Sequence, residues 1–220
     1  MDFLHDSKGT TRLINRVFHL ISLNLIWLIC CIPIVTIGAA TTAMYDVLLR
    51  LCFHEEISVV HTFFKKFIFH LKKATVLFLL VVVGTAFFAF DFWCSFFLSS
   101  AVRLVFQVFI LCIGYFWAAF VCFLFPTLAY FNFNIKRTLK YAFAFAMKNG
   151  VYTLFIMLIS FLPFLLFLLV PGFYFNTSLL WITIGFAVLA QVNAMYFARI
   201  FDENRLNQLQ NQSNQENSQR

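Results

Sequence analysis

The stretch "CCIPIVTIGAATTAMYDVLLR", residues 30–50, decides how this chain is arranged in a membrane. An apolar run meets Pro33, passes Thr36 and Gly38, and continues to the charged residues Asp46 and Arg50. The chain either crosses a bilayer once here or turns and comes back. Proline removes a helix hydrogen bond and glycine tolerates positive φ, so Pro33, Thr36 and Gly38 are the residues we expect to form a turn.

The composition indicates that lipid is the solvent. The chain has 220 residues, of which 62% are hydrophobic and 11% charged, whereas soluble domains carry about 25% charged residues. A single soluble core cannot hide so much apolar surface. The net charge of +7 would suggest nucleic acid in a soluble protein, but the basic residues lie between apolar runs, so we expect no nucleic-acid partner.

Five apolar segments are long enough to span a bilayer core of about 30 Å. They lie at 17–35, 74–98, 104–131, 151–170 and 178–200. Residues 37–49 reach only about 20 Å as a helix. We therefore predict an all-α polytopic bundle of five full spans plus a short returning helix after Pro33 and Gly38. That short helix must pack against protein, because an incomplete span leaves polar backbone at its tip.

The distribution of Lys and Arg supports the turn. With a turn, residues 1–16, 50–73, 132–150 and 199–220 face one side and hold three, five, four and three basic residues, and only Arg103 lies opposite. With a single crossing, the better orientation splits them twelve to four. Because cytoplasmic loops carry the Lys/Arg excess, we predict a multi-pass protein of the cell membrane with both termini cytoplasmic.

Two of the basic stretches have helical apolar periodicity. They are "SVVHTFFKKFIFHLKKA" (58–74) and "NIKRTLKYAFAFAMKNG" (134–150). We predict two basic amphipathic interfacial helices that lie on anionic lipid at the cytoplasmic face; a docking surface for a cytoplasmic partner is the alternative. The basic residues of these helices are Lys65, Lys66, Lys72, Lys73, Lys136, Arg137 and Lys140.

Few polar residues within the spans are candidates for a binding site. Asp46 lies one helical turn before Arg50, so it forms either an ion pair at the cytoplasmic edge or a carboxylate that faces a cavity behind the turn. The amides Asn24, Gln191 and Asn193 are further candidates, and hydrogen bonds between helices explain them adequately. The sequence holds no CxxC, HExxH, GxxxxGK[ST], GxGxxG or GxSxG motif. We expect no metal, no cofactor and no catalytic residues.

The chain divides by composition into two parts. Residues 1–203 form the predicted integral membrane domain. Residues 204–220 are rich in Asn and Gln, a composition that cannot build a core, so we predict a disordered cytoplasmic tail.

Three stretches resemble the YesL-like family, small integral membrane proteins of Gram-positive bacteria that are classed as a domain of unknown function. They are "NLIWLICCIPIVTIGAATTAMYDVLLRL" (24–51), "FFKKFIFHLKKA" (63–74) and "FPTLAYFNFNIKRTLKYAFAFAMKNG" (125–150). The resemblance covers most of residues 1–200, and the pattern Pro33-x-x-Thr36-x-Gly38 is its most specific part. The family often has proline after that glycine, where Ala39 stands here. Members are frequently encoded beside sugar-uptake ABC transporters and glycoside-degrading enzymes, which implies an accessory role in carbohydrate uptake.

Together these observations favour a non-enzymatic membrane accessory protein, with the lipid bilayer and ABC-transporter components as its expected partners. The alternative is a small transporter or substrate-capture subunit with a site near the broken first helix, because broken helices build midplane sites. An intramembrane enzyme is a third hypothesis, for which no nucleophile or metal set is visible. The sequence predicts no oligomeric state.

Overall fold

The computed structural model describes the backbone of residues 3–97, 99–169 and 179–218 and the side chains of 14–97, 99, 102–163, 166 and 179–202. Within these ranges the chain is helical and has no strand, which confirms the all-α prediction. The elements are α1 (Phe3–Cys31), η1 (Ile34–Thr36), α2 (Ile37–Cys52), α3 (Val59–Cys94), η2 (Ser95–Phe97), α4 (Ser100–Phe131), α5 (Ile135–Lys148), α6 (Gly150–Leu169), η3 (Trp181–Gly185, π-helical) and α8 (Phe186–Ser218).

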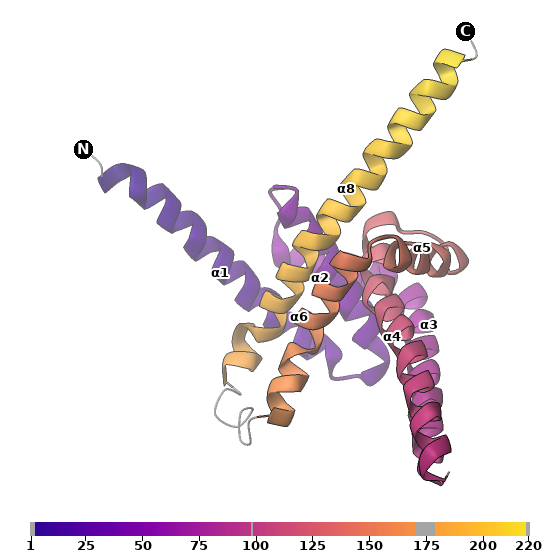
Figure 1. The fold of residues 1–220 in the computed structure, drawn as a ribbon. Coiled ribbons are helices and arrows are strands. Elements are labelled where there is room, and N and C mark those ends of the chain that lie inside the picture. The colour runs from indigo at the N-terminus through magenta and orange to yellow at the C-terminus, as the bar shows by residue number, and fades with distance from the viewer. Residues whose placement is uncertain (1–2, 98, 170–178, 219–220) are drawn as a thin grey trace.

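The helices form a polytopic bundle (Figure 1). Five described segments are long and apolar enough to cross a membrane: Ile14–Cys31, Ile34–Cys52, Val59–Phe97, Val102–Phe131 and Trp181–Asp202. A sixth arises if α5 and α6, which are bent by 102° at their junction, count as one broken span. The predicted returning helix is therefore long enough to span when η1 is included. The predicted span at 151–170 coincides with α6, which is 20 residues long.

The break between α1 and α2 occurs where the sequence predicted a turn. Pro33 has φ −75° and ψ 114°, and the next three residues form the 3₁₀ turn η1. The Thr36 hydroxyl lies 2.6 Å from the carbonyl oxygens of both Cys30 and Pro33. It can donate to either of them, so it helps to satisfy carbonyls that the end of α1 leaves without helical partners.

Gly38 has a different role from the predicted one. It lies within the first turn of α2 and does not need positive φ. A methyl group added at Gly38 would lie 2.6 Å from Cβ of Phe78 and 2.7 Å from the carbonyl oxygen of Ala74, both on α3. The glycine therefore lets the backbones of α2 and α3 approach closely, as small residues do in membrane bundles.

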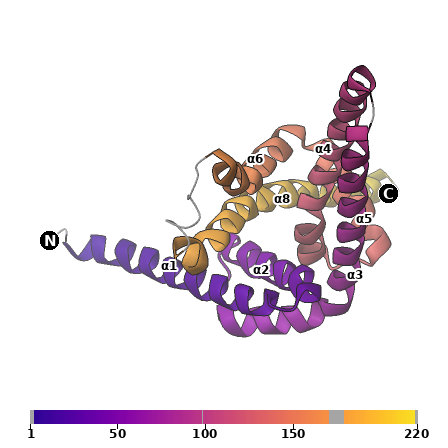
Figure 2. The ribbon, with the colours of Figure 1, turned by 90° about the horizontal axis from the view of Figure 1, so that it is seen from below.

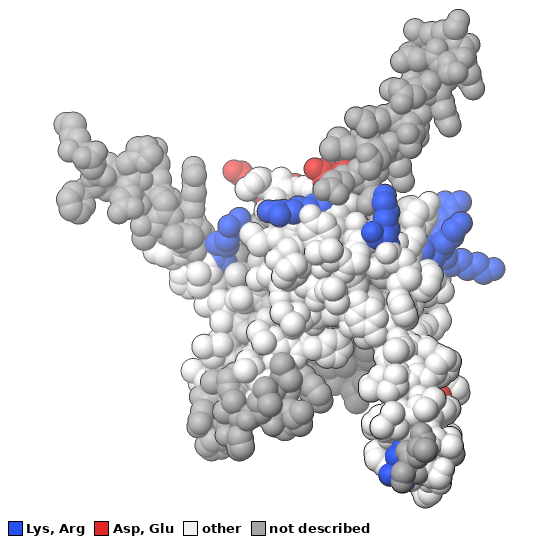
Figure 3. All heavy atoms as spheres, viewed as in Figure 1, with Lys and Arg blue, Asp and Glu red and all other residues white. Residues whose placement is uncertain are grey.

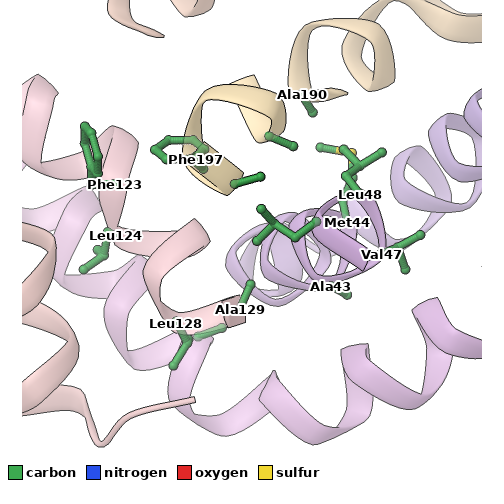
Figure 4. Packing of buried hydrophobic residues seen from close by; sticks show 14 of the residues in the cluster. Ala43, Met44, Val47, Leu48, Phe123, Leu124, Leu128, Ala129, Ala190 and Phe197 are labelled. Atoms are coloured by element: carbon green, nitrogen blue, oxygen red, sulfur yellow. The ribbon is translucent and has the colours of Figure 1, made fainter. Parts of the chain in front are cut away.

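α2 is the central helix of the bundle. It contacts α1, α3, α4 and α8, and Figure 2 shows it enclosed among them. Figure 4 shows Met44 and Leu48 directed toward Ala190 of α8. The prediction that this helix packs against protein is confirmed, and its small residues explain why several helices can approach it. Its buried residues are Gly38, Ala39, Ala40, Thr42, Ala43, Met44, Asp46, Val47, Leu48 and Leu49.

Of the two predicted amphipathic helices, one is a separate element. α5 matches the prediction for 134–150 and ends at Lys148, because the backbone of the next residue, Asn149, leaves the helical region (φ −111°, ψ 53°). Residues 59–73, in contrast, are the first part of the continuous helix α3, because no proline or glycine interrupts the chain before Gly84. Phe63 and His70 are fully buried. Part of this stretch thus packs on protein, whereas Val60, Phe64 and Ile68 are exposed. Its contact with anionic lipid stays a prediction.

The far ends of α3 and α4 form a hairpin that projects from the bundle (Figure 1). Its apolar side chains are mostly exposed, for example Phe87 at 61% and Phe109 at 61%. The Trp117 ring occupies the space beside Gly84, and Trp117 Nε1 donates to Thr85 Oγ1 at 3.2 Å. The hairpin is thus held by contacts between its own two helices.

α1 begins and α8 ends at the same end of the bundle, and the Lys and Arg side chains gather there (Figures 1 and 3). We call this the basic end. The tip of the α3–α4 hairpin lies at the opposite end. Arg103 is the only Lys or Arg between residues 74 and 135. α8 continues to Ser218. The side chains of the predicted tail, 204–220, lie outside the described residues, and both its disorder and the boundary after residue 203 stay predictions.

Candidate functional site

A buried ion cluster joins α2 to α3 at the basic end. The Asp46 side chain is only 3% exposed. Its Oδ1 accepts from Arg50 Nε at 2.7 Å, and its Oδ2 lies 2.9 Å from Lys66 Nζ and 3.6 Å from Nε2 of His70. The predicted pair one helical turn apart is confirmed, but it is part of a larger cluster that includes two residues of α3.

The local sequence explains this arrangement. Asp46 and Arg50 lie one turn apart on α2, and Lys66 and His70 lie one turn apart on α3, so each pair occupies one helix face. The close contact at Gly38 brings the two helices together. Sequence reasoning missed Lys66 and His70 as partners of Asp46. Their own four-residue spacing was the available signal, but it does not reveal which helix they face.

A small cavity adjoins the cluster. Arg50 Nη1 reaches Glu55 Oε2 at 2.8 Å, and the turn that brings Glu55 back contains His54 in the left-handed region (φ 59°). The cavity has a volume of about 230 Å³. Its lining combines charged, amide and aromatic groups: Asp46, Leu49, Arg50, Phe53, Glu55, Lys66, Phe69, Ala129, Tyr130 and Asn132.

The ion cluster stabilises the contact between α2 and α3. Both carboxylate oxygens of Asp46 are occupied by side chains of this chain, so the buried charge is compensated within the protein. Because an isolated buried charge is costly, Asp46 fixes α3 against α2. Arg50 is 36% and Lys66 24% exposed in their side chains, so their remaining donor groups lie near the cavity and solvent.

Asn24 satisfies the backbone at a helix irregularity. It is fully buried on α1. Its Nδ2 donates to the carbonyl oxygens of Ile182 at 2.7 Å and Trp181 at 3.3 Å, and its Oδ1 accepts from the Ala187 amide at 2.9 Å. These groups belong to η3 and the turn after it, where the π-helical winding changes the normal hydrogen-bond pattern. Asn24 thus ties α1 to the start of α8.

The other two predicted amides also link helices. Gln191 Nε2 lies 3.3 Å from Cys52 Sγ, and Asn193 Nδ2 donates to Ser160 Oγ at 3.0 Å. Neither they nor Asn24 lines the Asp46 cavity. The four candidate residues therefore do not converge on one site, and the interpretation of the amides as helix-to-helix hydrogen bonds fits their contacts.

The predicted basic residues fall into two groups. Lys66 belongs to the ion cluster, and Lys73 Nζ donates to Asn132 Oδ1 at 3.1 Å. A second cavity, of about 480 Å³, lies where α5 begins and includes Lys73 in its lining. The exposed group consists of Lys65, Lys72, Lys136, Arg137 and Lys140. Among the described residues, no group of three or more His, Cys, Asp or Glu side chains is placed to hold a metal ion.

Comparison with known proteins gives a family match for a segment in the N-terminal half of the chain. Residues 20–92 match the model of a family described as "Protein of unknown function, DUF624", to which YesL-like proteins belong. The match covers the last twelve residues of α1, all of α2 and most of α3, and thus includes the whole Asp46 cluster. No curated protein matches the chain. No solved structure matches it either.

Proposed function

We propose that the chain is a non-enzymatic accessory protein of the cell membrane that contacts components of a carbohydrate ABC transporter. The contact is made by the exposed basic residues of α3 and α5 at its basic end, which faces the cytoplasm. One observation carries the proposal. The intramembrane polar groups Asp46, Asn24 and Asn193 are engaged within the bundle, whereas six basic side chains of α3 and α5 remain exposed at one end. The accessible charged surface is therefore outside the membrane core.

Two further arguments support this proposal. The Lys/Arg excess at the end where both termini lie is typical of cytoplasmic loops. The resemblance to YesL-like proteins, whose members are frequently encoded beside sugar-uptake transporters in Gram-positive bacteria, suggests which partner to test first. In this function the ion cluster serves to hold α2 and α3 in register, so that the exposed basic residues keep fixed positions.

Affinity purification after mild cross-linking tests the proposal. We expect the membrane-spanning and ATP-binding subunits of a carbohydrate ABC transporter to co-purify with the tagged chain. The double variant Lys65→Gln/Lys72→Gln should reduce their recovery. The matched control Arg16→Gln/Arg199→Gln removes two exposed charges from α1 and α8 and should not. Absence of transporter subunits at normal abundance of the chain, together with unchanged sugar uptake after its deletion, would contradict the proposal.

The alternative function is a small transporter or substrate-capture subunit. The cavity beside Asp46 favours it, because carboxylate, guanidinium, amide and aromatic groups converge there. This cavity lies at the Arg50 end of α2 and not at the break near Pro33, where the alternative first placed a site. Uptake of labelled sugars into proteoliposomes that contain only this chain would support it, provided that Asp46→Asn abolishes uptake while the amount of inserted protein is unchanged.

A further inference from the structure

A second cavity, distinct from that beside Asp46, lies between α3 and the start of α5. Its volume is about 480 Å³. Three cationic side chains and no carboxylate line it; the lining residues are Lys73, Asn134, Ile135, Lys136 and Arg137. Lys73 comes from α3 and the others from the beginning of α5, so the cavity depends on the packed fold.

The backbone at this cavity also lacks partners. Asn134 precedes α5, but its side chain makes no capping hydrogen bond. The first helical bond runs from the Thr138 amide to the Asn134 carbonyl oxygen at 2.9 Å. The amides of residues 135–137 therefore have no acceptor within the helix, and they add partial positive charge to the cationic side chains.

The cations are available for a ligand to different degrees. Lys73 Nζ is positioned by Asn132 Oδ1 at 3.1 Å, which uses one of its three donors. Lys136 and Arg137 are exposed, and no ion pair among the described side chains involves them. An anion with several acceptor oxygens would satisfy both the side chains and the free amides, because charge-assisted bonds to phosphate are strong.

The position of α5 points to a lipid as the source of that anion. α5 is bent by 102° from α6, so it lies across the bundle's direction at the basic end (Figures 1 and 3). Lys136, Lys140 and Phe143 follow a four- and three-residue spacing and share one face. Phe143 also lines an apolar cavity of about 350 Å³, together with side chains of α3 and α4. One face of α5 thus joins a cationic cavity to an apolar one.

We propose that the cavity formed by Lys73, Lys136, Arg137 and the first amides of α5 binds the phosphate of an anionic phospholipid headgroup, and that an acyl chain of the same lipid lies along Phe143. Basic pockets between helices at the cytoplasmic side bind such headgroups. The inference rests on the proposed cytoplasmic placement of the basic end for its choice of leaflet. The binding itself requires neither that orientation nor a transporter partner.

Lipid binding in neutral detergent tests the proposal, because no charged bilayer surface is then present. Native mass spectrometry with added phosphatidylglycerol should show one tightly retained molecule per chain, in preference to phosphatidylcholine. Removing three cations should lower the apparent affinity about a hundredfold, so Lys73→Gln/Lys136→Gln/Arg137→Gln should lose the retained lipid. The control Lys65→Gln/Lys72→Gln/Arg199→Gln removes equal charge outside the cavity lining and away from the face that joins Lys136 to Phe143, and it should retain the lipid.

Each other outcome overturns the proposal. Equal loss in both triple variants would show that charge alone attracts the lipid. Equal retention in both would show that the cavity is not the site. Displacement of phosphatidylglycerol by millimolar inorganic phosphate would identify a free anion as the ligand. Thermal unfolding of each variant excludes misfolding, and Lys136→Glu/Arg137→Glu, which changes only exposed side chains, provides a second test with a larger expected loss.

Discussion

The helices α3 and α4 contribute to both the bundle around α2 and the projecting hairpin, but these two regions are stabilised differently. Around α2 the contacts are dense, with Ala39, Ala43 and Val47 fully buried and a carboxylate enclosed at Asp46. In the hairpin, bulky side chains such as Phe109 point outward. The difference shows that small residues allow several helices to contact α2, whereas in the aromatic-rich hairpin the two helices contact mainly each other.

The largest effect should come from the charge enclosed in the bundle. Asp46→Asn leaves Arg50 and Lys66 without their carboxylate, and stranding partners of a buried pair costs about 3–5 kcal/mol. Because both cations are partly exposed, we expect a value of about 3 kcal/mol, measured by unfolding in detergent. Asp91→Asn, in the hairpin, serves as the control and should change the free energy of unfolding by less than about 0.5 kcal/mol.

Double variants that replace Asp46 together with one of its cations test which cations belong to the cluster. Asp46→Leu/Lys66→Met should recover more stability than Asp46→Leu/Arg50→Leu. The reason is that Arg50 keeps Glu55 at 2.8 Å in the first variant, whereas Lys66 is left stranded beside the apolar replacement in the second. Equal stability of the two double variants would contradict the assignment of Lys66 to the cluster.

The second prediction compares alanine substitutions at two glycines, whose effects on the free energy of unfolding should have opposite signs. Gly38→Ala places a methyl group against Phe78 and the Ala74 carbonyl, and overpacking of this kind costs about 1–3 kcal/mol. Gly114 on α4 has no heavy atom within 4 Å of an added Cβ, so Gly114→Ala should gain up to about 1 kcal/mol from helix propensity. A melting temperature that rises in both variants would disprove the close α2–α3 contact.

The third effect tests Asn24, which satisfies three backbone groups. Asn24→Leu removes its hydrogen bonds to Ile182 and Ala187 and should destabilise the fold by about 1–2 kcal/mol. Asn193→Leu is the comparison, because it loses one bond to a side chain, Ser160, and should cost less. Proteolysis near η3 provides the measurement of local loosening. Equal sensitivity of both variants would argue against a special role for Asn24.

The smallest effect lies in the hairpin. Trp117→Phe removes the hydrogen bond to Thr85 at 3.2 Å and should cost about 0.6 kcal/mol, typical of such bonds in membrane proteins. Thr85→Val should give the same value, and the double variant should add nothing further. A loss as large as that of Asp46→Asn would show that the hairpin is a packed unit and would weaken the contrast with the bundle.

Local features of the sequence were sufficient for some parts of this structure. Pro33 marked the break after α1, the four-residue spacing predicted the Asp46–Arg50 pair, and the apolar periodicity of 134–150 predicted α5. These features act within a turn or two of helix, where spacing and backbone preference determine the geometry.

Other parts depended on how helices register against one another. Lys66 and His70 meet Asp46 only because α2 and α3 approach at Gly38, and Asn24 finds its acceptors 157 and 158 residues away. No local pattern distinguishes these residues from other polar groups on amphipathic helices. The same reason applies to 59–73, whose apolar spacing suits burial on protein, as at Phe63, as well as burial in lipid.

The central position of α2 has a consequence for how the protein is made. Tyr45 of α2 packs edge-on against Phe197 of α8, with ring centroids 5.7 Å apart. About 150 further residues must be synthesised before this partner exists, which at 5–20 residues per second takes roughly 10–30 s. During that interval the Ala- and Thr-rich α2 lacks α8, one of the helices that enclose it in the folded protein. Its retention in the membrane until synthesis ends therefore depends on α1 and α3, its neighbours in the nascent chain, and slowed translation should expose α2 to quality-control proteases.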